Sequence, residues 1–534
     1  MESPSGSPRT NVADVLLRGG TYRSLEQQQL SPMEEKFEKF RRISGFILAP
    51  LGFILMLTVP GGMDPTQQKV AAVLVGVILL WLCESLPIPV TGLLGVGMLV
   101  LIGTAPAAEV LAPFGSTTIF TFIGAFILAQ AMLKHGVAQR VAYFVLGLPG
   151  VGTSTVRIIL AFGGITCALS AFVSNTATVA MLLPTALGIL TVIAQLMQDK
   201  GIVKEDFDPM RLRVGAALML MLAYGASIGG LLTPVGAPPN LIGRGLIEEA
   251  TGERISFGQW VMTAAPICAC MLVALTVILF LVNRPETRRI DGVAEFIAER
   301  KKAQGKMSRA EINTVIAFSV TVFLWIFPAV LGMFTGVDSP IYEVVDERLN
   351  EGIVAVLGAV LLFILPVKPR QLTYTLDWSD AAKIDWGTIL LFGSGMIFGA
   401  MLGDSGLATS IGEGLNGMLG VSSGLVITAM AVILAIIISE TTSNTAAAAV
   451  TVPIVVPLAV AAGVDPVIPA MAATFGASFG FMLPISTPQN AIVYGSGCVS
   501  IGRMVRTGIS FDIIGAVLIV LFLPWVASLV GIGG

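Results

Sequence analysis

The sequence predicts an all-α polytopic membrane protein built from two inverted-topology repeats, each with a re-entrant hairpin and an unwound transmembrane helix. The 534-residue chain is 55% hydrophobic and 12% charged, and its mean hydropathy is +0.86. Soluble domains carry roughly 25% charged residues. Within this apolar sequence, each half contains one polar motif followed by one proline-rich segment.

The polar motifs interrupt two long apolar runs. The run Leu425–Ala462 contains the segment Ser439–Thr445 (SETTSNT) at its middle. A continuous helix of that length would measure roughly 55 Å, against a hydrocarbon core of about 30 Å. Two half-helices that meet at a polar tip fit better, because non-helical backbone at membrane depth must be buried in protein or line a water-filled cavity. The motif Ser174–Thr176 (SNT) interrupts the run Val156–Met197 in the same way.

The proline-rich segments form the second matched pair. Thr233–Asn240 (TPVGAPPN) and Leu483–Asn490 (LPISTPQN) both carry proline six and two residues before the terminal asparagine. Proline inside a helix costs about 3 kcal/mol or more, so each segment predicts an unwound transmembrane helix. Matched broken helices in two halves indicate a transporter binding site. The competing interpretation is that the polar side chains only join membrane helices.

The N-terminal region precedes the first membrane span. Residues 1–31 are polar, have no apolar core of the signal-peptide type, and are expected to form a disordered cytoplasmic tail. Residues 32–42 place Met33, Phe37 and Phe40 at helical spacing. This pattern predicts an interfacial amphipathic helix on the cytoplasmic membrane surface.

The remaining chain is assigned to spans by its apolar segments. The first span and repeat 1 occupy residues 43–283, a basic cytoplasmic linker occupies 284–309, and repeat 2 occupies 310–534. About 11 transmembrane segments are expected in all. Besides the hairpins and unwound helices, the apolar segments are Ile43–Val59, Val70–Leu86, Val90–Ile102, Thr117–Leu133, Ala264–Val282, Ile312–Leu331, Ile353–Val367, Gly387–Leu402 and Ile513–Leu529.

Charged residues predict the orientation of the spans. The basic linker belongs in the cytoplasm by the positive-inside rule, whereas the acidic segment 336–351 belongs on the opposite side. The N-terminus is therefore expected to be cytoplasmic and the C-terminus extracytoplasmic. The first hairpin has basic flanks and should enter from the cytoplasm, and the second, flanked by Asp404 and Glu413, should enter from outside. Opposite entry is what defines an inverted repeat.

Other functional classes are not favoured. The single histidine, His135, has no partner for a catalytic triad, and the five cysteines lack metal-ligand spacing. Glu440 is the one acidic residue expected inside a span. An intramembrane enzyme or a cation/proton antiporter would need more buried acidic residues. The basic linker contains interleaved acidic residues, so no nucleic-acid partner is expected.

The chemistry of the motifs suits a cation together with an anion. Hydroxyls, amide oxygens and unwound carbonyls suit a hard cation, and the helix N-terminus after each tip suits an anion. The motif segments contain no Lys, Arg or His, so a cation must accompany an anion to the membrane midplane. Na⁺ suits the oxygen-rich tips. The alternative is a sodium-independent exchanger in which a basic residue such as Arg244 folds over the site.

One extended pattern carries a family resemblance. The residues Ala477-Ser478-x-x-Phe481-x-x-Pro484-Ile485-Ser486-x-x-x-Asn490-x-Ile492-Val493, the duplicated Ser-Asn-Thr and the segment WLCESLPIPVTG resemble the divalent anion/sodium symporter family, also called INDY-like sodium-dicarboxylate/sulfate cotransporters. The resemblance runs from about Ile43 to the C-terminus. It implies a homodimer in the plasma or inner membrane, with a scaffold domain and a transport domain that moves as an elevator. The implied activity is sodium-coupled uptake of a divalent anion, favouring a C4-dicarboxylate such as succinate, malate or fumarate, with a sulfate-selective symporter as an alternative.

The same resemblance implies individual site residues. One sodium ion would be held by Ser170, Ser174, Asn175 and Gly236, and a second by Ser439, Thr442, Asn444 and Ser486. The anion would contact Ser174, Asn175, Ala237, Pro238, Ser443, Asn444, Thr445, Thr487 and Pro488. Several relatives carry a hydroxyl residue where this chain has Ala237, so one hydrogen bond to the anion would be missing here.

Overall fold

The computed structural model describes residues 32–59, 62–204, 207–288, 292–336, 339–419 and 423–533. The expected disordered tail, residues 1–31, lies outside this part of the chain. Within the described ranges, eleven helices are long and apolar enough to cross a membrane. Their number agrees with the prediction and confirms a helical polytopic membrane protein.

The helices follow one another with short connections. In the first half they are α1 (Pro32–Thr58), α2 (Pro65–Cys83), α3 (Ile88–Leu101), α4 (Ala107–Leu111), α5 (Thr117–Lys134), α6 (Val137–Leu146), α7 (Thr155–Ser170), α8 (Asn175–Asp199), α9 (Arg213–Leu231), α10 (Pro238–Thr251) and α11 (Phe257–Val282). Single 3₁₀ turns lie at Ala112–Gly115, Val151–Thr153, Pro209–Arg211 and Pro369–Gln371.

The second half repeats this layout with additions. Its helices are α12 (Val293–Ala303), α13 (Arg309–Thr335), α14 (Pro340–Arg348), α15 (Glu351–Ile364), α16 (Trp378–Ala381), α17 (Trp386–Asp404), α18 (Leu407–Leu419), α19 (Gly424–Thr441), α20 (Asn444–Ala461), α21 (Val467–Ala477), α22 (Pro488–Gly495) and α23 (Ile501–Leu529). A short antiparallel pair, β1 (Pro366–Lys368) and β2 (Thr373–Tyr374), connects α15 to α16.

The structure contains all four predicted breaks in the helices. The first polar motif separates α7 from α8, and the second separates α19 from α20. The proline-rich segments separate α9 from α10 and α21 from α22. In both tips a serine hydroxyl caps the next helix, since Ala177 N–H donates to Ser174 Oγ at 3.3 Å and Ala446 N–H donates to Ser443 Oγ at 3.2 Å. Each tip therefore presents a helix N-terminus.

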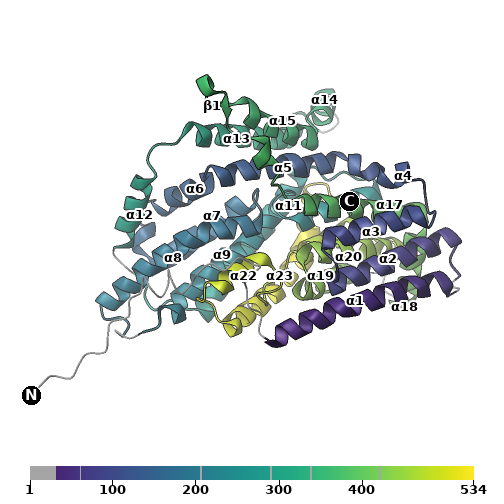
Figure 1. Cartoon of the computed structure of the whole chain (residues 1–534), viewed down its shortest axis with the longest axis horizontal. Helices are drawn as coiled ribbons and strands as arrows, with labels where there is room; N and C mark the ends of the chain where they lie inside the picture. Colours follow the sequence, from purple (N-terminus) through teal and green to yellow (C-terminus); the bar gives the residue numbers. More distant parts are fainter. Residues whose placement is uncertain are drawn as a thin grey trace, which may run out of the picture.

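The broken helices form the interior of the molecule. Every residue of α9 from Val214 onward is buried. In Figure 1, α13, α14 and α15 run along one edge and α1 runs along the opposite edge, with the broken helices between them. The broken helices therefore lie among other helices, which is the setting that non-helical backbone requires.

The N-terminal boundary differs from the prediction. Residues 32–42 do not form a separate interfacial helix, because α1 continues through them into the first span without a break. Arg41, at the expected boundary, donates to the Glu84 carboxylate at 2.8 Å and to the Thr441 carbonyl at 3.0 Å. Glu84, in the connection between α2 and α3, is thus an ion-pair partner of Arg41.

The basic linker contains a helix that packs against the rest of the protein. It contains α12, whose Val293 and Ile297 are buried. The Lys301 ammonium lies 5.3 Å from the centre of the Phe144 ring in α6. One face of this segment therefore packs against the membrane helices.

Candidate ion and anion site

The first tip gathers oxygen atoms from three segments. The Ser170 hydroxyl at the end of α7 donates to Asn175 Oδ1, at the start of α8, over 2.7 Å. A Cβ atom at Gly230 would lie 2.5 Å from the same Oδ1, so only glycine lets the amide approach α9 this closely. A Cβ atom at Gly236 would lie 2.6 Å from the Gly230 carbonyl oxygen and 2.9 Å from that of Ala171. Side-chain and carbonyl oxygens thus converge around Asn175.

The second tip repeats this arrangement. The Ser439 hydroxyl lies 2.8 Å from Asn444 Oδ1 and 2.8 Å from the Ala477 carbonyl, and its single proton serves one of them at a time. Asn444 Nδ2 donates to the Ser478 carbonyl at 3.2 Å. A Cβ atom at Gly480 would lie 3.0 Å from Asn444 Oδ1. The serine, the asparagine and the facing glycine therefore recur as a unit.

The terminal asparagine of each proline-rich segment holds that segment in shape. Asn240 Nδ2 donates to the carbonyls ten and seven residues earlier, at 2.6 and 2.8 Å. Asn490 Nδ2 donates to the carbonyls ten and seven residues earlier, at 2.7 and 3.1 Å. Each amide replaces helical hydrogen bonds that the prolines prevent. The sequence pattern marked these asparagines as matched positions without indicating this function.

The predicted cation ligands and anion contacts range from buried to exposed, and burial does not divide the two sets, since exposed Ser174 belongs to both. The hydroxyl residues Ser170, Ser439 and Ser486 are buried, whereas Ser174 and Pro488 are exposed. Thr442 is buried and donates its hydroxyl to the Ile438 carbonyl within its own helix, at 2.8 Å. The other predicted contacts divide into buried Ala237 and Thr487 and half-buried Asn175, Pro238, Ser443, Asn444 and Thr445.

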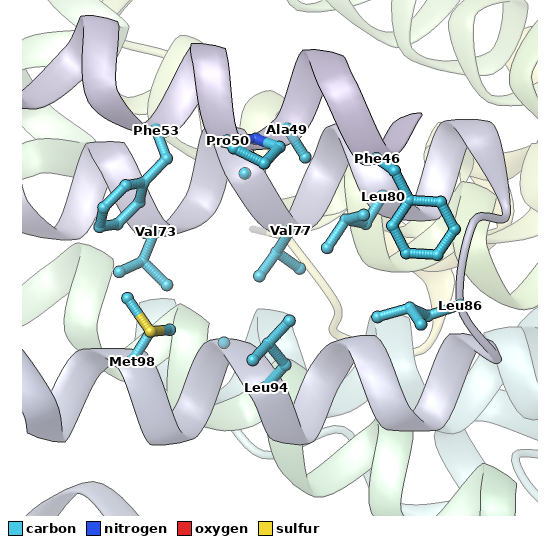
Figure 2. A pocket seen from close by; sticks show the side chains of 12 residues that line it. Phe46, Ala49, Pro50, Phe53, Val73, Val77, Leu80, Leu86, Leu94 and Met98 are labelled. Carbon is cyan, nitrogen blue, oxygen red and sulfur yellow. The ribbon is translucent and has the colours of Figure 1, made fainter. Parts of the chain in front are cut away.

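A cavity of about 310 Å³ lies elsewhere, among α1, α2 and α3. Figure 2 shows side chains such as Phe46, Phe53, Val77, Leu94 and Met98 around it. All its lining residues are apolar. This cavity suits hydrocarbon rather than an anion.

A smaller cavity of about 190 Å³ lies at the first tip. It is lined by Ser174, Gly236 and Pro238 and also by Lys383, a residue that the sequence analysis did not single out. Lys383 donates to Asp380 at 3.1 Å. Hydrogen bonds from Lys134 and Lys383 hold the pKa of Asp380 below its ordinary value, so this acid stays ionised beside the cavity. The sequence indicated Lys383 only by its position just before the predicted span Gly387–Leu402.

Arg244 does not fold over the tips. Its guanidinium donates to Glu351 on α15 at 2.6 Å and to Glu248 at 2.8 Å, and the residue is 3% exposed. Both carboxylates pair with this guanidinium. The exchanger alternative, in which Arg244 neutralises the anion, would require Arg244 to leave both of them.

A second acidic residue is buried inside a span. The predicted last span began at Ile513 and left Asp512 outside, but α23 begins at Ile501 and Asp512 is 5% exposed. The expectation that Glu440 is the one intramembrane acid was therefore wrong. The apolar run Ile513–Leu529 begins after Asp512, because the polar residues Thr507 and Ser510 also lie on the N-terminal side of this run. A hydropathy pattern does not show burial by tertiary packing.

Comparisons with known proteins agree with the motif resemblance. The family described as "Sodium:sulfate symporter transmembrane region" matches residues 41–532. The sodium-dependent dicarboxylate transporter SdcS of Staphylococcus saprophyticus subsp. saprophyticus is 34% identical over 493 residues, which cover 91% of this chain and 92% of that protein. SdcS of Staphylococcus aureus is 32% identical over 493 residues, with 92% of each chain covered.

A solved structure is also similar. The crystal structure of the Alcanivorax borkumensis YdaH transporter, described as having an unusual topology, aligns with a TM-score of 0.49 and 16% identity, covering 80% of this chain and 89% of that one. The family assignment depends instead on the match along residues 41–532 and on the two SdcS relatives. The chain belongs to the sodium:sulfate symporter family.

Proposed function

We propose that this protein is a secondary active transporter that couples uptake of a divalent anion, a C4-dicarboxylate such as succinate, to the entry of Na⁺. The observation that carries the proposal is the repeated tip, in which a serine–asparagine hydrogen bond stands beside a capped helix N-terminus. Such N-termini attract anions, and the clustered oxygens suit a hard cation. The names of the two SdcS relatives favour dicarboxylate over sulfate.

The electrostatics support coupling to a cation. A dianion near the membrane midplane would cost at least several kcal/mol without compensation. Helix N-termini supply about half a charge each, and Arg244 is already paired with Glu351 and Glu248. One Na⁺ at each tip would supply the missing positive charge.

The proposed order of events follows from the shared asparagines. Na⁺ at the first tip would use Ser170, Ser174, Asn175 and Gly236, and Na⁺ at the second would use Ser439, Thr442, Asn444 and Ser486. Binding of Na⁺ fixes Asn175 and Asn444, whose amide groups then face the anion. Sodium therefore prepares the anion site. The anion contacts would be Ser174, Asn175, Ala237, Pro238, Ser443, Asn444, Thr445, Thr487 and Pro488.

The proposal includes the movement and assembly of the protein. The broken helices would form a transport domain that carries the site across the membrane as an elevator. The other helices would form a scaffold, and two scaffolds would pair in a homodimer. The two repeats would be inverted in the membrane, with the N-terminus cytoplasmic and the C-terminus extracytoplasmic.

Uptake of labelled succinate by proteoliposomes tests the function. With an inward sodium gradient at fixed pH, uptake should be saturable and should fall to background when choline replaces sodium. Unlabelled sulfate, citrate and 2-oxoglutarate, added as competitors, would define the anion class. Uptake at full rate without sodium, especially if it requires a trapped counter-anion, would establish exchange instead. Sodium-dependent uptake of labelled sulfate, without uptake of labelled succinate, would establish a sulfate-selective symporter.

A further inference from the structure

Asp512 lies on a face of α23 that packs against the second unwound segment. Gly508, Asp512 and Gly515 are spaced four and three residues apart, so they share one helix face. A Cβ atom at Gly508 would lie 2.4 Å from the Phe481 carbonyl oxygen, and one at Gly515 would lie 2.2 Å from the Phe479 ring. Two glycines thus bring the backbone of α23 close to this segment, with Asp512 between them.

The carboxylate of Asp512 is buried without a hydrogen-bond donor. The residue is 5% exposed, and neither Oδ1 nor Oδ2 accepts a hydrogen bond among the described residues. An isolated buried carboxylate costs several kcal/mol even after the protein relaxes. A proton or a cation is therefore required at these two oxygens.

Glu440 reaches the same segment from the second hairpin. Its Oε1 accepts from the Phe481 and Met482 backbone N–H groups at 2.6 and 2.8 Å, and its Oε2 accepts from the Ser486 hydroxyl at 2.7 Å. These donors suit an ionised carboxylate. Because each carboxylate oxygen accepts about two hydrogen bonds, Oε2 still has capacity for another ligand.

The two acidic residues meet at Phe481 and Met482, and no ion pair joins either of them to a basic residue in the described part of the chain. A Cβ atom at Gly508, one turn before Asp512, would lie 2.4 Å from the Phe481 carbonyl oxygen and 2.7 Å from the Met482 Cα, and the backbone N–H groups of these two residues donate to Glu440. The nearby Tyr224 hydroxyl donates to the Phe481 and Met504 carbonyls, at 2.6 and 3.2 Å, rather than to either acid. Among the described residues, the donors to Glu440 are two backbone N–H groups and one hydroxyl, all uncharged.

We propose that Asp512 and Glu440 bind a further Na⁺, in addition to the ions at the two tips; this proposal rests on the sodium-coupled function proposed above. Carboxylate oxygens are preferred ligands of hard cations, and the unpartnered Asp512 oxygens provide coordination sites. The ion would contact Glu440, which is hydrogen-bonded to Ser486, a proposed ligand at the second tip. Occupancy of this site would thereby be coupled to the second tip site.

The first repeat has no counterpart of this acidic pair. Asn175 and Asn444 correspond to each other, so Ala171, four residues before Asn175, takes the place of Glu440. Helix α11, which closes the first repeat as α23 closes the second, contains no acidic residue. The additional ion therefore belongs to the second repeat alone, and it makes the two tips unequal.

Equilibrium binding of radioactive ²²Na⁺ to the purified full-length protein tests the proposal. The wild-type protein should bind one Na⁺ per protomer beyond the two tip ions, and Asp512→Asn should bind one fewer than wild type. Asparagine has the same shape, and it removes no hydrogen bond that Asp512 accepts. The control Glu347→Gln removes an acid from an exposed position and should bind as wild type does. The Hill coefficient for sodium-driven succinate uptake should fall by about one in Asp512→Asn.

The outcomes separate this inference from the proposed function. A wild-type protein that binds only two Na⁺ per protomer would overturn the additional site, and this measurement needs no variant. Equal sodium binding by wild type and Asp512→Asn would also overturn it. If Asp512→Asn loses proton movement but retains its sodium count, the pair holds a proton and the inference is wrong. Absence of any sodium binding or sodium-dependent uptake in wild type would instead contradict the proposed function itself.

Discussion

At the scale of single residues, Asn175 and Asn444 bring together the proposed cation and anion sites. Each amide oxygen accepts from a serine five residues earlier, at 2.7 and 2.8 Å. Asn444 Nδ2 also donates to the Ser478 carbonyl at 3.2 Å. The asparagines are therefore the positions where a small change should have the largest effect on transport.

The first prediction removes these amides. Asn175→Ala and Asn444→Ala should each reduce sodium-driven succinate uptake to background, because a cation ligand and an anion contact are lost together. Uptake should be normalised to the amount of protein in the membrane. Asn350→Ala, which changes only a helix cap on α15, is the control and should retain uptake. Near-normal transport by either tip variant would remove that tip from the site.

The second prediction concerns the glycines that face these amides. Gly230→Ala places a Cβ atom 2.5 Å from Asn175 Oδ1 and must displace it, whereas Gly480→Ala places one at a tighter-than-usual 3.0 Å from Asn444 Oδ1. The sodium concentration for half-maximal uptake should rise by about tenfold in Gly230→Ala, equivalent to about 1.4 kcal/mol, and by less in Gly480→Ala. Gly164→Ala meets no atom within 4 Å and should match wild type. A Gly230→Ala protein with unchanged sodium dependence would contradict the proposed position of the ion.

Residue types could be predicted from the sequence, but their partners could not. Ser170, Asn175, Ser439 and Asn444 follow from the repeated motif and the family resemblance. Asp512 could not be found in this way, because its burial depends on two glycines of α23 that pack against a segment distant in the chain.

At the scale of elements, one asparagine side chain stabilises the backbone conformation of each unwound segment. Asn240 and Asn490 use both amide hydrogens on backbone carbonyls. Prolines in the sequence predicted where the helices break, since proline removes a donor and cannot continue a helix. The sequence could not predict how the released carbonyls are satisfied.

The third prediction tests these asparagines with isosteric variants. Asn240→Asp and Asn490→Asp replace an amide donor with an acceptor that faces two carbonyl oxygens. Each variant should lose about 2–3 kcal/mol of stability for two missing hydrogen bonds and melt at a lower temperature in detergent. Asn350→Asp keeps its capping bond, because the Gly352 N–H needs only an oxygen acceptor. An unchanged melting temperature in both test variants would exclude this function of the asparagines.

Element boundaries were predicted less accurately than element types. The sequence placed a boundary near Arg42 and another at Ile513, but α1 and α23 continue through both positions. A charged residue, Arg42 or Asp512, lies directly before each predicted span. Arg41 is accommodated by Glu84, and the Asp512 position is enclosed by packing, so these charges do not mark the ends of helices.

At the scale of the whole molecule, orientation in the membrane is the prediction that a single labelling experiment resolves. In a background without the five native cysteines, a cysteine at Lys302 should be protected from an impermeant thiol reagent in intact cells. A cysteine at Glu347 should react. Both positions are exposed, so access to the reagent depends on the side of the membrane. Reaction of both from the same side would contradict the proposed topology.

The ion pair between Arg244 and Glu351 joins α10, which continues an unwound helix, to α15, which packs against α5 and α13. If α10 travels with a moving domain while α15 stays in place, the pair must separate in every transport cycle. Breaking a buried pair costs about 3–5 kcal/mol, which would slow that step by roughly 10²–10⁴-fold. An ion pair that must break in this way would give the resting protein a long-lived conformation and make the turnover rate rise steeply with temperature. Replacing both charges, Arg244→Met with Glu351→Leu, would then remove this barrier and make the turnover rate less dependent on temperature.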